Sequence, residues 1–548
     1  MTLSPRRDWL AVLLAVLSGL ALAWLPLTES LLLFVGAALV LATLVRPQVS
    51  LYLLPFAVPF GGIREVTLGG LRVTATEVLV GLLIVGWLAR GVAQRGIHVF
   101  GRPASGPPTT APTPRDRPCL PPLFWPLCLL LGTMALSLLD TLSYTASAKE
   151  LLKWLEVLAV YLVAASLLTA KEAETPVAPA GPGTSLPRPR LRPVTAGLWL
   201  AAALLAAGTL EALVGLLGSL LKIGPPSYAI LGGLIYRASG DFWQPNPFAG
   251  YMNQVWPLAL ALLASGALLP VSRFSLPASR LTPHVSRFSF HASLAALLSA
   301  LCLPLAALLL SWSRGAWLGA VVAVAVMALV WTGSLLASKD APDRRQGRRA
   351  LSVLLVGTVL LTILGLLGAA DLLPPAIADR LGSITEGVEV LGEVRTVKVT
   401  DENFASVERA AHWWAGWRMW EDHPWTGVGI GNYAVAYPTY NLPAWPDPLG
   451  HAHNFYINLG AEAGTLGLAA YLVFLVAALW QATRIAWGAR DAWLRGVALG
   501  VLGILVARIV QDGLDNLWVH SMGVQVALLL ALLTSHPVSG MLARHFDP

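Results

Sequence analysis

The 548-residue chain is 56% hydrophobic and only 12% charged, and its mean hydropathy is +0.67. A soluble globular protein carries about twice that charged fraction, so the composition excludes a soluble globule. It predicts an all-α fold, a polytopic membrane bundle of about 12 to 14 transmembrane helices. The net charge of +7 is explained by membrane topology and anionic lipid, and no nucleic-acid partner is expected.

Apolar runs close to the roughly 20 residues that cross a bilayer recur along the chain. The third run is short and contains proline, so the number of spans could fall by one or two. Arg6 and Arg7 before the first run also fit a secretion signal, but an uncleaved first helix is favoured because no soluble domain follows. The predicted spans lie near 9–26, 30–46, 48–62, 74–92, 121–140, 150–169, 195–221, 251–270, 292–311, 315–337, 351–371, 455–483, 493–510 and 519–535.

Lysine and arginine concentrate in alternate loops between these spans, which sets the expected orientation. All five basic loops have the same parity, so they are expected on the cytoplasmic side, together with both termini. The basic residues are Arg90, Arg95, Arg102, Arg115 and Arg117; Lys171, Arg188, Arg190 and Arg192; Arg273, Arg280 and Arg287; Lys339, Arg344, Arg345, Arg348 and Arg349; and Arg484, Arg490 and Arg495.

The segments of opposite parity are expected to face the periplasm or the exterior, and they contain the informative polar residues. They are 222–250, 311–315, 372–452 and 511–518. The predicted organisation is an N-terminal set of transmembrane helices over 1–220, a catalytic region over 221–535 that includes the loop 372–452, and a cytoplasmic tail over 536–548. Neither a disulfide framework nor a metal site is predicted, since Cys119, Cys128 and Cys302 lie in or near apolar segments.

Within the long outward loop, residues 408–425 predict an amphipathic helix that ends at His423 and Pro424. Arg409 shares a face with three tryptophans, as expected of a helix at a bilayer interface. The alternative is that Arg409 pairs with Glu408 or only extends toward water. The glycine-rich run 427–432 predicts a tight turn and not a dinucleotide site, because a helix precedes it where a strand is required.

Two further outward positions carry chemistry. Arg314 lies in a bend between two apolar helices, where its guanidinium suits phosphate oxygens, although it could instead satisfy helix-end carbonyls. His453 begins an apolar run, and an ionisable group at a membrane boundary needs a reason. His453 could also lack a catalytic role, because four other histidines are expected to face outward: His412, His423, His451 and His520.

Four motifs in order resemble the O-antigen ligase and O-antigen polymerase family of bacterial envelope glycosyltransferases. The similarity covers roughly residues 235–480. The motifs are Arg237 followed by Pro-Asn246-Pro-Phe-Ala-Gly250; Ser311-Trp-Ser-Arg314-Gly-Ala; Arg409 with the tryptophan-rich helix and His423-Pro-Trp-Thr-Gly-Val-Gly; and His453-Asn454 followed by Gly464-Thr-Leu-Gly467.

The resemblance implies transfer of a glycan from undecaprenyl pyrophosphate to an acceptor hydroxyl at the outer face of the bacterial inner membrane, without metal or cofactor. It implies His453 as the catalytic base. Arg314 and Arg409, and with them Arg237, are implied to bind the pyrophosphate. Asn454 is expected to orient the imidazole ring or the sugar, and Gly464 and Gly467 to permit close packing from one helix face.

The acceptor is left open by the sequence. Lipid A-core would make the chain a ligase, which the complete histidine signature favours; a second lipid-linked repeat would make it a polymerase, and a protein side chain an O-oligosaccharyltransferase. A transporter or flippase of lipid-linked glycans is a further alternative. Its best support is Glu211, an acid well inside a predicted span, for which a hydrogen bond between helices is the favoured explanation.

Overall fold

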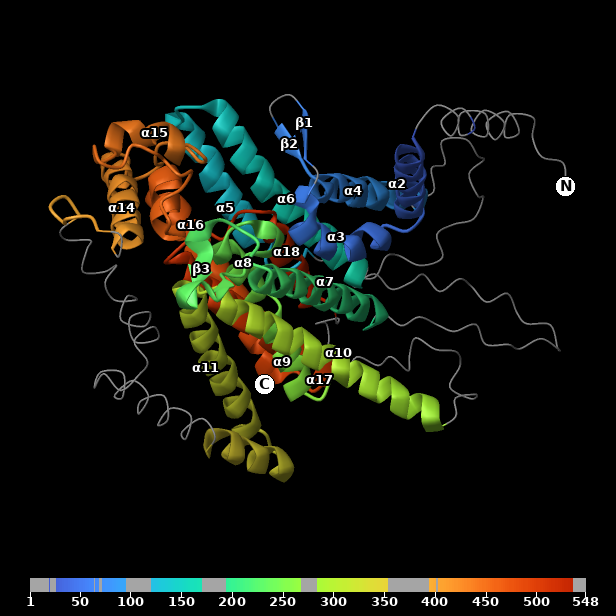
Figure 1. Ribbon diagram of the computed structural model, residues 1–548. Coiled ribbons are helices and arrows are strands. Elements are labelled where there is room, and N and C mark those ends of the chain that lie inside the picture. The colour runs from blue at the N-terminus through green and yellow to red at the C-terminus, as the bar shows by residue number, and fades with distance from the viewer. Residues whose placement is uncertain are drawn as a thin grey trace, which may run out of the picture.

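The computed structural model describes residues 19, 26–63, 65–68, 71–94, 120–169, 194–267, 283–352, 394–400 and 403–535. Over these residues the chain is an all-α polytopic membrane bundle with two minor hairpins (Figure 1). The hairpins are antiparallel and pair β1 (Val66–Leu68) with β2 (Leu71–Val73) and β3 (Ala229–Ile230) with β4 (Ile235–Tyr236). The predicted fold class is confirmed.

Eight helices in the described part of the chain are long and apolar enough to cross a membrane. They are α2 (Leu27–Val45), α4 (Ala75–Gln94), α6 (Tyr144–Thr169), α7 (Val194–Leu220), α10 (Pro283–Leu310), α11 (Arg314–Leu336), α16 (Phe455–Gly488) and α17 (Ala492–Asp512). Each coincides with a predicted span. Shorter apolar helices match three more: α3 (Gln48–Phe60), α5 (Phe124–Leu136) and α18 (Met522–Leu532). The predicted spans 9–26 and 351–371 fall almost wholly outside the described residues.

The predicted span 251–270 is broken. It becomes two short helices, α8 (Pro245–Met252) and α9 (Trp256–Ala264). The break is stabilised by Asn253, which is buried and whose side-chain amide donates to the carbonyl of Ala316 (3.0 Å) and accepts from the indole of Trp256 (2.9 Å). Backbone outside a regular helix at membrane depth requires partners of this kind.

The helices around α17 form the centre of the bundle. Helix α17 packs against α9, α11 and α16, and α18 packs against α6. Glycines allow the closest of these approaches: a Cβ on Gly319 of α11 would lie 2.6 Å from the carbonyl oxygen of Ala507 on α17. The turn between α17 and α18 begins at this central helix, and its Leu517 is fully buried.

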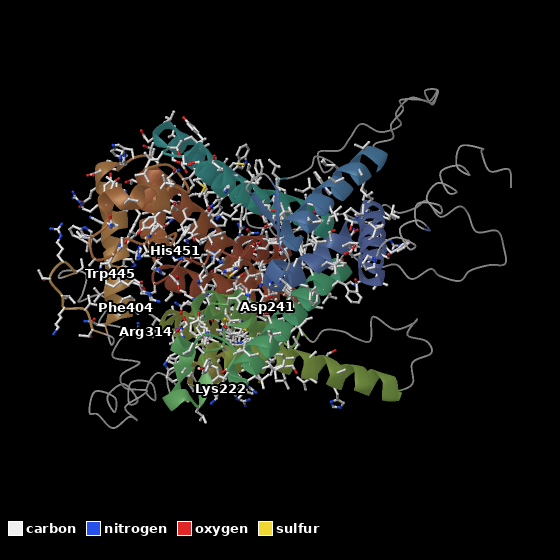
Figure 2. All side chains as sticks on the ribbon, turned by 45° about the horizontal axis from the view of Figure 1, so that its top comes forward. Lys222, Asp241, Arg314, Phe404, Trp445 and His451 are labelled. Carbon is white, nitrogen blue, oxygen red and sulfur yellow. The ribbon has the colours of Figure 1, made fainter. Side chains whose placement is uncertain are left out.

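Residues 403–452 form a separate layer on one side of this bundle, across the molecule from α2 and α4 (Figure 1). It consists of α14 (Phe404–Asp422), α15 (Tyr433–Tyr440) and the loop that leads into α16. At the first turn of α14, the ring of Phe404 packs 5.1 Å from that of Trp445 (Figure 2). Helix α14 buries one face against α16, so this layer is fixed to the bundle.

The glycine-rich run after α14 is a turn, as predicted. Gly427, Gly429 and Gly431 all have positive φ, and a Cβ on any of them would come within 2.8 Å of backbone atoms of a neighbouring segment. Only glycine combines this conformation with so close an approach. The turn joins α14 to both α6 and α16.

Candidate active site

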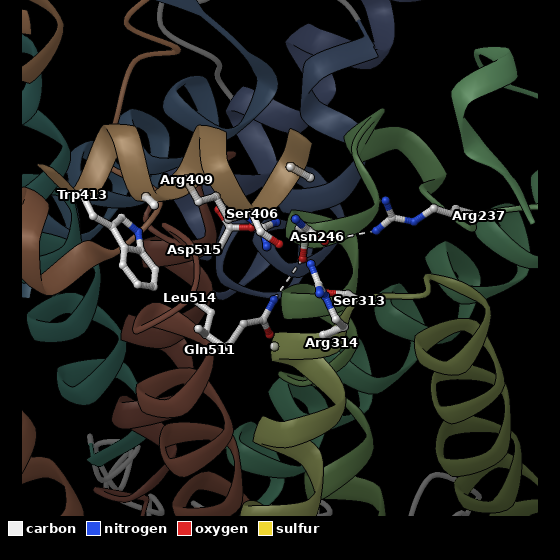
Figure 3. Close-up of a pocket in the computed structure, with 13 residues that line it drawn as sticks. Arg237, Asn246, Ser313, Arg314, Ser406, Arg409, Trp413, Gln511, Leu514 and Asp515 are labelled. Carbon is white, nitrogen blue, oxygen red and sulfur yellow. Dashed lines mark hydrogen bonds between the residues drawn. The ribbon is translucent and has the colours of Figure 1, made fainter. Parts of the chain in front are cut away.

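A cavity of about 130 Å³ lies where α14 crosses the ends of α11 and α17 (Figure 3). It gathers three arginines, Arg237, Arg314 and Arg409, which are far apart in the sequence. The remaining lining side chains include Asn246, Ser313, Ser406, Trp413, Gln511 and Asp515. We call this cavity the arginine pocket.

Arg237 is held from the segment between α7 and α8. Its Nε donates to the carbonyl of Ser311 (2.8 Å), and its Nη2 donates to the side-chain oxygen of Asn246 (3.2 Å). The carbonyl of Asn246 in turn accepts from Gln511 (3.1 Å; Figure 3). Burial and the positive charge of Arg409 lower the pKa of Arg237 to about 10. These cations raise one another's free energy when the pocket is empty, which favours an anion there.

Arg314 is the first residue of α11 and follows a sharp bend. The bend places Trp312 at φ +57° and Ser313 at the N-cap, where its backbone N–H bonds the hydroxyl of Ser311 (3.3 Å). Both Arg314 and the N-terminus of the 23-residue helix therefore border the arginine pocket. Guanidinium groups and helix N-termini both stabilise phosphate oxygens.

Arg409 reaches the arginine pocket from above, on the face of α14 that also carries Ser406 and Trp413 (Figure 3). Opposite it lies Asp515, which follows α17 and is 6% exposed. Burial raises the pKa of Asp515, but the neighbouring His453 and the charge of Arg409 outweigh it and lower that pKa to about 2. Asp515 is therefore a carboxylate at neutral pH.

His453 adjoins the arginine pocket through this carboxylate. Its Nδ1 lies 3.6 Å from Oδ1 of Asp515. Neither ring nitrogen has a hydrogen-bond partner among the described residues. The backbone of His453 is held at φ +52° by its N–H, which donates to Nδ1 of His451 (3.1 Å), and by its carbonyl, which accepts from Trp413 (3.2 Å). Such a conformation is costly for a non-glycine residue and is concentrated at functional sites.

Two other imidazoles surround His453. The ring of His451 lies 4.4 Å from that of His453, and the ring of His412 lies 5.7 Å away. Burial, together with the charge of neighbouring imidazoles, lowers the pKa of each to about 4. Both are therefore neutral at pH 7, and His412 is further fixed by stacking on Tyr437 at 4.8 Å.

His451, His453 and Asp515 also form a group that is able to hold a metal ion, with ligand atoms within 4.8 Å of one another. The sequence predicts no metal here. Two features disfavour one: Nδ1 of His451 is engaged by a backbone N–H, and the charge of Arg409 acts on both Asp515 and His451. A cation at this position would compete with the guanidinium.

Residues 297–472 match the family model described as O-antigen ligase. The match covers 176 of the 548 residues, and this part of the chain is similar to the O-antigen ligase family. It supports the resemblance drawn from the motifs, and the long apolar helices are those of a multi-pass membrane protein. No curated protein matches the chain.

The ligase-family match includes Arg314, Arg409 and His453, but Arg237 and Asp515 lie outside it. The structure nevertheless brings Arg237, Arg314 and Arg409 to one cavity, with Asp515 of the same cavity beside His453. The sequence-based interpretation missed Asp515. The available signal was an acid in the predicted outward turn 511–518, next to the end of a predicted span.

Asn454, which is expected from the sequence to orient the imidazole ring or the sugar, forms its hydrogen bonds with backbone groups. Its side-chain oxygen accepts from the backbone N–H groups of Tyr456 and Ile457 at the start of α16, and its amide donates to the carbonyl of Gly513 (2.8 Å). It caps α16 and ties this helix to the turn that carries Asp515. It does not line the arginine pocket.

The packing role predicted for Gly464 and Gly467 on one helix face was wrong. Gly464 has φ +65° and ψ −170°, so it kinks α16, and the two glycines do not share one regular helix. A Cβ on Gly464 would lie 2.2 Å from the backbone of Trp425, whereas one on Gly467 would meet only Ala463 of its own helix. Gly464 therefore permits a kink in α16, against which the loop after α14 packs.

Proposed function

We propose that the chain transfers a glycan from undecaprenyl pyrophosphate to an acceptor hydroxyl at the outer face of the bacterial inner membrane. The observation that carries this proposal is the arginine pocket, whose three guanidinium groups adjoin the His453–Asp515 pair. A donor with two phosphates supplies the anionic partner that such a pocket favours. The alternation of basic loops supports an orientation with both termini cytoplasmic and this pocket outside.

The reaction is a displacement at the anomeric carbon. The acceptor oxygen forms the new bond as the bond from that carbon to the pyrophosphate oxygen breaks, and the arginines stabilise the charge that grows on the pyrophosphate. His453 takes the acceptor proton. Because Nδ1 faces Asp515, Nε2 is the nitrogen that receives it, and Asp515 stabilises the resulting imidazolium. A single displacement inverts the anomeric configuration.

His451 positions the base in this scheme. Its Nδ1 accepts the backbone N–H of His453 and thereby holds that residue in its left-handed conformation. The low pKa of His451 keeps this nitrogen unprotonated and able to accept. No metal takes part in the proposed reaction, so dialysis against a chelator is expected to leave transfer unchanged.

Reconstitution in proteoliposomes with a radiolabelled undecaprenyl-pyrophosphate glycan tests the proposal. Lipid A-core, a second lipid-linked repeat and a peptide are offered separately, and the product separates ligase, polymerase and protein O-oligosaccharyltransferase. Label that crosses the bilayer without a new glycosidic bond would instead identify a transporter. The anomeric configuration of the product, read by NMR, tests the single displacement.

Substitutions test the assigned roles. His453→Ala is expected to abolish transfer and retain donor binding, and normal turnover in this variant would refute the base. Arg314→Ala is expected to raise the donor KM, with Arg314→Lys intermediate because it keeps the charge but not the paired donors. Arg418→Ala is the matched control, since Arg418 lies on α14 but is exposed and paired with Glu421.

A further inference from the structure

A second and larger cavity, of about 510 Å³, lies on the other side of the turn between α17 and α18. Its wall is built from α3, the first turn of α4, residues 150–157 of α6, the 3₁₀ turn Gly240–Phe242 and the residues around the start of α18. Its volume falls in the range of small-molecule sites. The proposed mechanism gives this cavity no role.

The charge of this cavity is opposite to that of the arginine pocket. Five carboxyl side chains line it, two of them on α6, together with one lysine: Glu65, Glu77, Glu150, Glu156, Asp241 and Lys153. We call it the acidic cavity. Lys153 pairs with Glu150, which leaves the acids in excess. Phosphate groups are repelled from such a lining, whereas hydroxyl and ammonium groups donate to it.

Aromatic side chains supply an apolar surface between these acids. Trp154 and Trp518 lie with ring centroids 4.2 Å apart, and Phe242 also borders the acidic cavity. Flat apolar rings beside hydrogen-bond acceptors suit a ligand whose faces are apolar and whose edges carry hydroxyl groups. A sugar ring has that character.

One short stretch of chain contributes to the walls of both cavities. Leu514 and Asp515 border the arginine pocket, and Trp518 and His520, a few residues on, border the acidic cavity. Figure 2 labels one residue of each cavity, Asp241 of the acidic cavity and Arg314 of the arginine pocket. The polar ends that build the acidic cavity also follow the parity of the outward loops, so both cavities are expected on the same side of the membrane.

We propose that the acidic cavity is the acceptor site, and that it takes the end of an uncharged or amino-bearing glycan in preference to a phosphorylated one. This inference rests on the proposed function and narrows its acceptor class. A transfer between two substrates requires two adjoining sites. Because the two cavities have opposite charge, the arginine pocket binds the pyrophosphate end of the donor and the acidic cavity binds the acceptor glycan. A phosphorylated lipid core is disfavoured as acceptor.

Equilibrium binding to the full-length protein in detergent, without donor, tests the site independently of catalysis. The probes are three soluble oligosaccharides that differ in one terminal substituent: a hydroxyl, an amine or a phosphate monoester. We expect the hydroxyl and amine probes to bind at least tenfold more tightly than the phosphate probe. Glu150→Gln and Asp241→Asn are expected to narrow that preference, and Glu421→Gln, an exposed acid on α14, is the matched control.

Steady-state transfer kinetics then show whether the acidic cavity binds the acceptor glycan or the sugar part of the donor. The cavity variants are expected to raise the acceptor KM about tenfold and leave the donor KM unchanged. A raised donor KM, equal or tighter binding of the phosphate probe, or a preference unaltered by both variants would each overturn the inference. If the wild type glycosylates none of the probes, the proposed function is refuted. The binding preference of the acidic cavity is then judged from the equilibrium measurements alone. Thermal unfolding of each variant shows that it is folded.

Discussion

Asp515→Asn is the substitution that most sharply separates catalysis from donor binding in this site. Asparagine keeps the size of the side chain and one acceptor oxygen but removes the charge that faces Nδ1 of His453 at 3.6 Å. The carboxylate is 6% exposed, so little solvent screens it. If His453 becomes positively charged as it takes the acceptor proton, the variant loses a stabilisation that exists only once that proton has moved.

The size of the loss follows from the distance. Two unit charges 3.6 Å apart interact by about 4 to 5 kcal/mol at an effective dielectric constant of about 20. The charge of Arg409 already acts on the same carboxylate, and proton transfer is only partial in the transition state, so we take about half of this, roughly 2 to 3 kcal/mol. That corresponds to a fall in kcat of roughly 30- to 150-fold.

Donor binding is expected to change in the opposite sense. Without the carboxylate, Arg409 attracts pyrophosphate more strongly, so the donor KM stays constant or falls. Transfer kinetics with radiolabelled donor measure both constants, and Asp447→Asn, an exposed acid in the same layer, serves as the control. A kcat within threefold of the wild type, or a donor KM that rises at constant kcat, would refute the role given to Asp515.

Two further predictions concern stability. Gly464→Ala is expected to destabilise the protein by more than about 3 kcal/mol, because the new Cβ meets the backbone of Trp425 at 2.2 Å and the residue has positive φ; in thermal unfolding, Gly218→Ala on α7, where nothing lies within 4 Å, should be tolerated, and equal effects would contradict the packing argument. Because burial lowers the pKa of His412 from 6.5 to about 4, the unfolded chain binds the extra proton between these values, and the stability contributed by neutral His412 falls by about 2 to 3 kcal/mol as the pH drops from 6.5 to 4. His451, whose pKa is lowered in the same way, adds a loss of the same sign. Denaturant unfolding at several pH values measures the sum, and His412→Gln is expected to make the profile shallower by the share of His412, whereas an unchanged profile would contradict the assignment.

The helices were predictable because their signal is local. Length and hydropathy suffice for a membrane helix, which has to satisfy its own backbone in lipid. The prediction of one span over 251–270 was wrong for a physical reason. The run is apolar enough to span a membrane, but the side chain of Asn253 forms hydrogen bonds with α11 and within its own turn, and these stabilise a break. Ala316 lies far away in the sequence, so the composition of the run does not reveal the break.

The candidate arginines and histidine were found in the sequence by another kind of signal. Arg314 and His453 are charged or titratable groups at the predicted outer ends of apolar runs, where such residues are rare without a function, whereas Arg237 and Arg409 lie in the polar segments between runs and were found through their motifs. Asp515 has the same kind of position, yet it was overlooked because acids near helix ends are common. Its significance depends on burial beside His453 and Arg409, which only the folded chain establishes.

The backbone of His453 connects these observations. Glycine would adopt φ +52° at no cost, and asparagine at less cost than histidine, so the conformation is kept for the side chain that it presents. Three contacts support it from three segments: Nδ1 of His451, the indole of Trp413 on α14, and the turn of Asp515, which Asn454 ties to α16. The same turn carries the wall of the acidic cavity at Trp518. The proposed base, its carboxylate and the acidic cavity therefore depend on one turn, and the side chain of Asn454, next to His453, anchors the carbonyl of Gly513 in that turn.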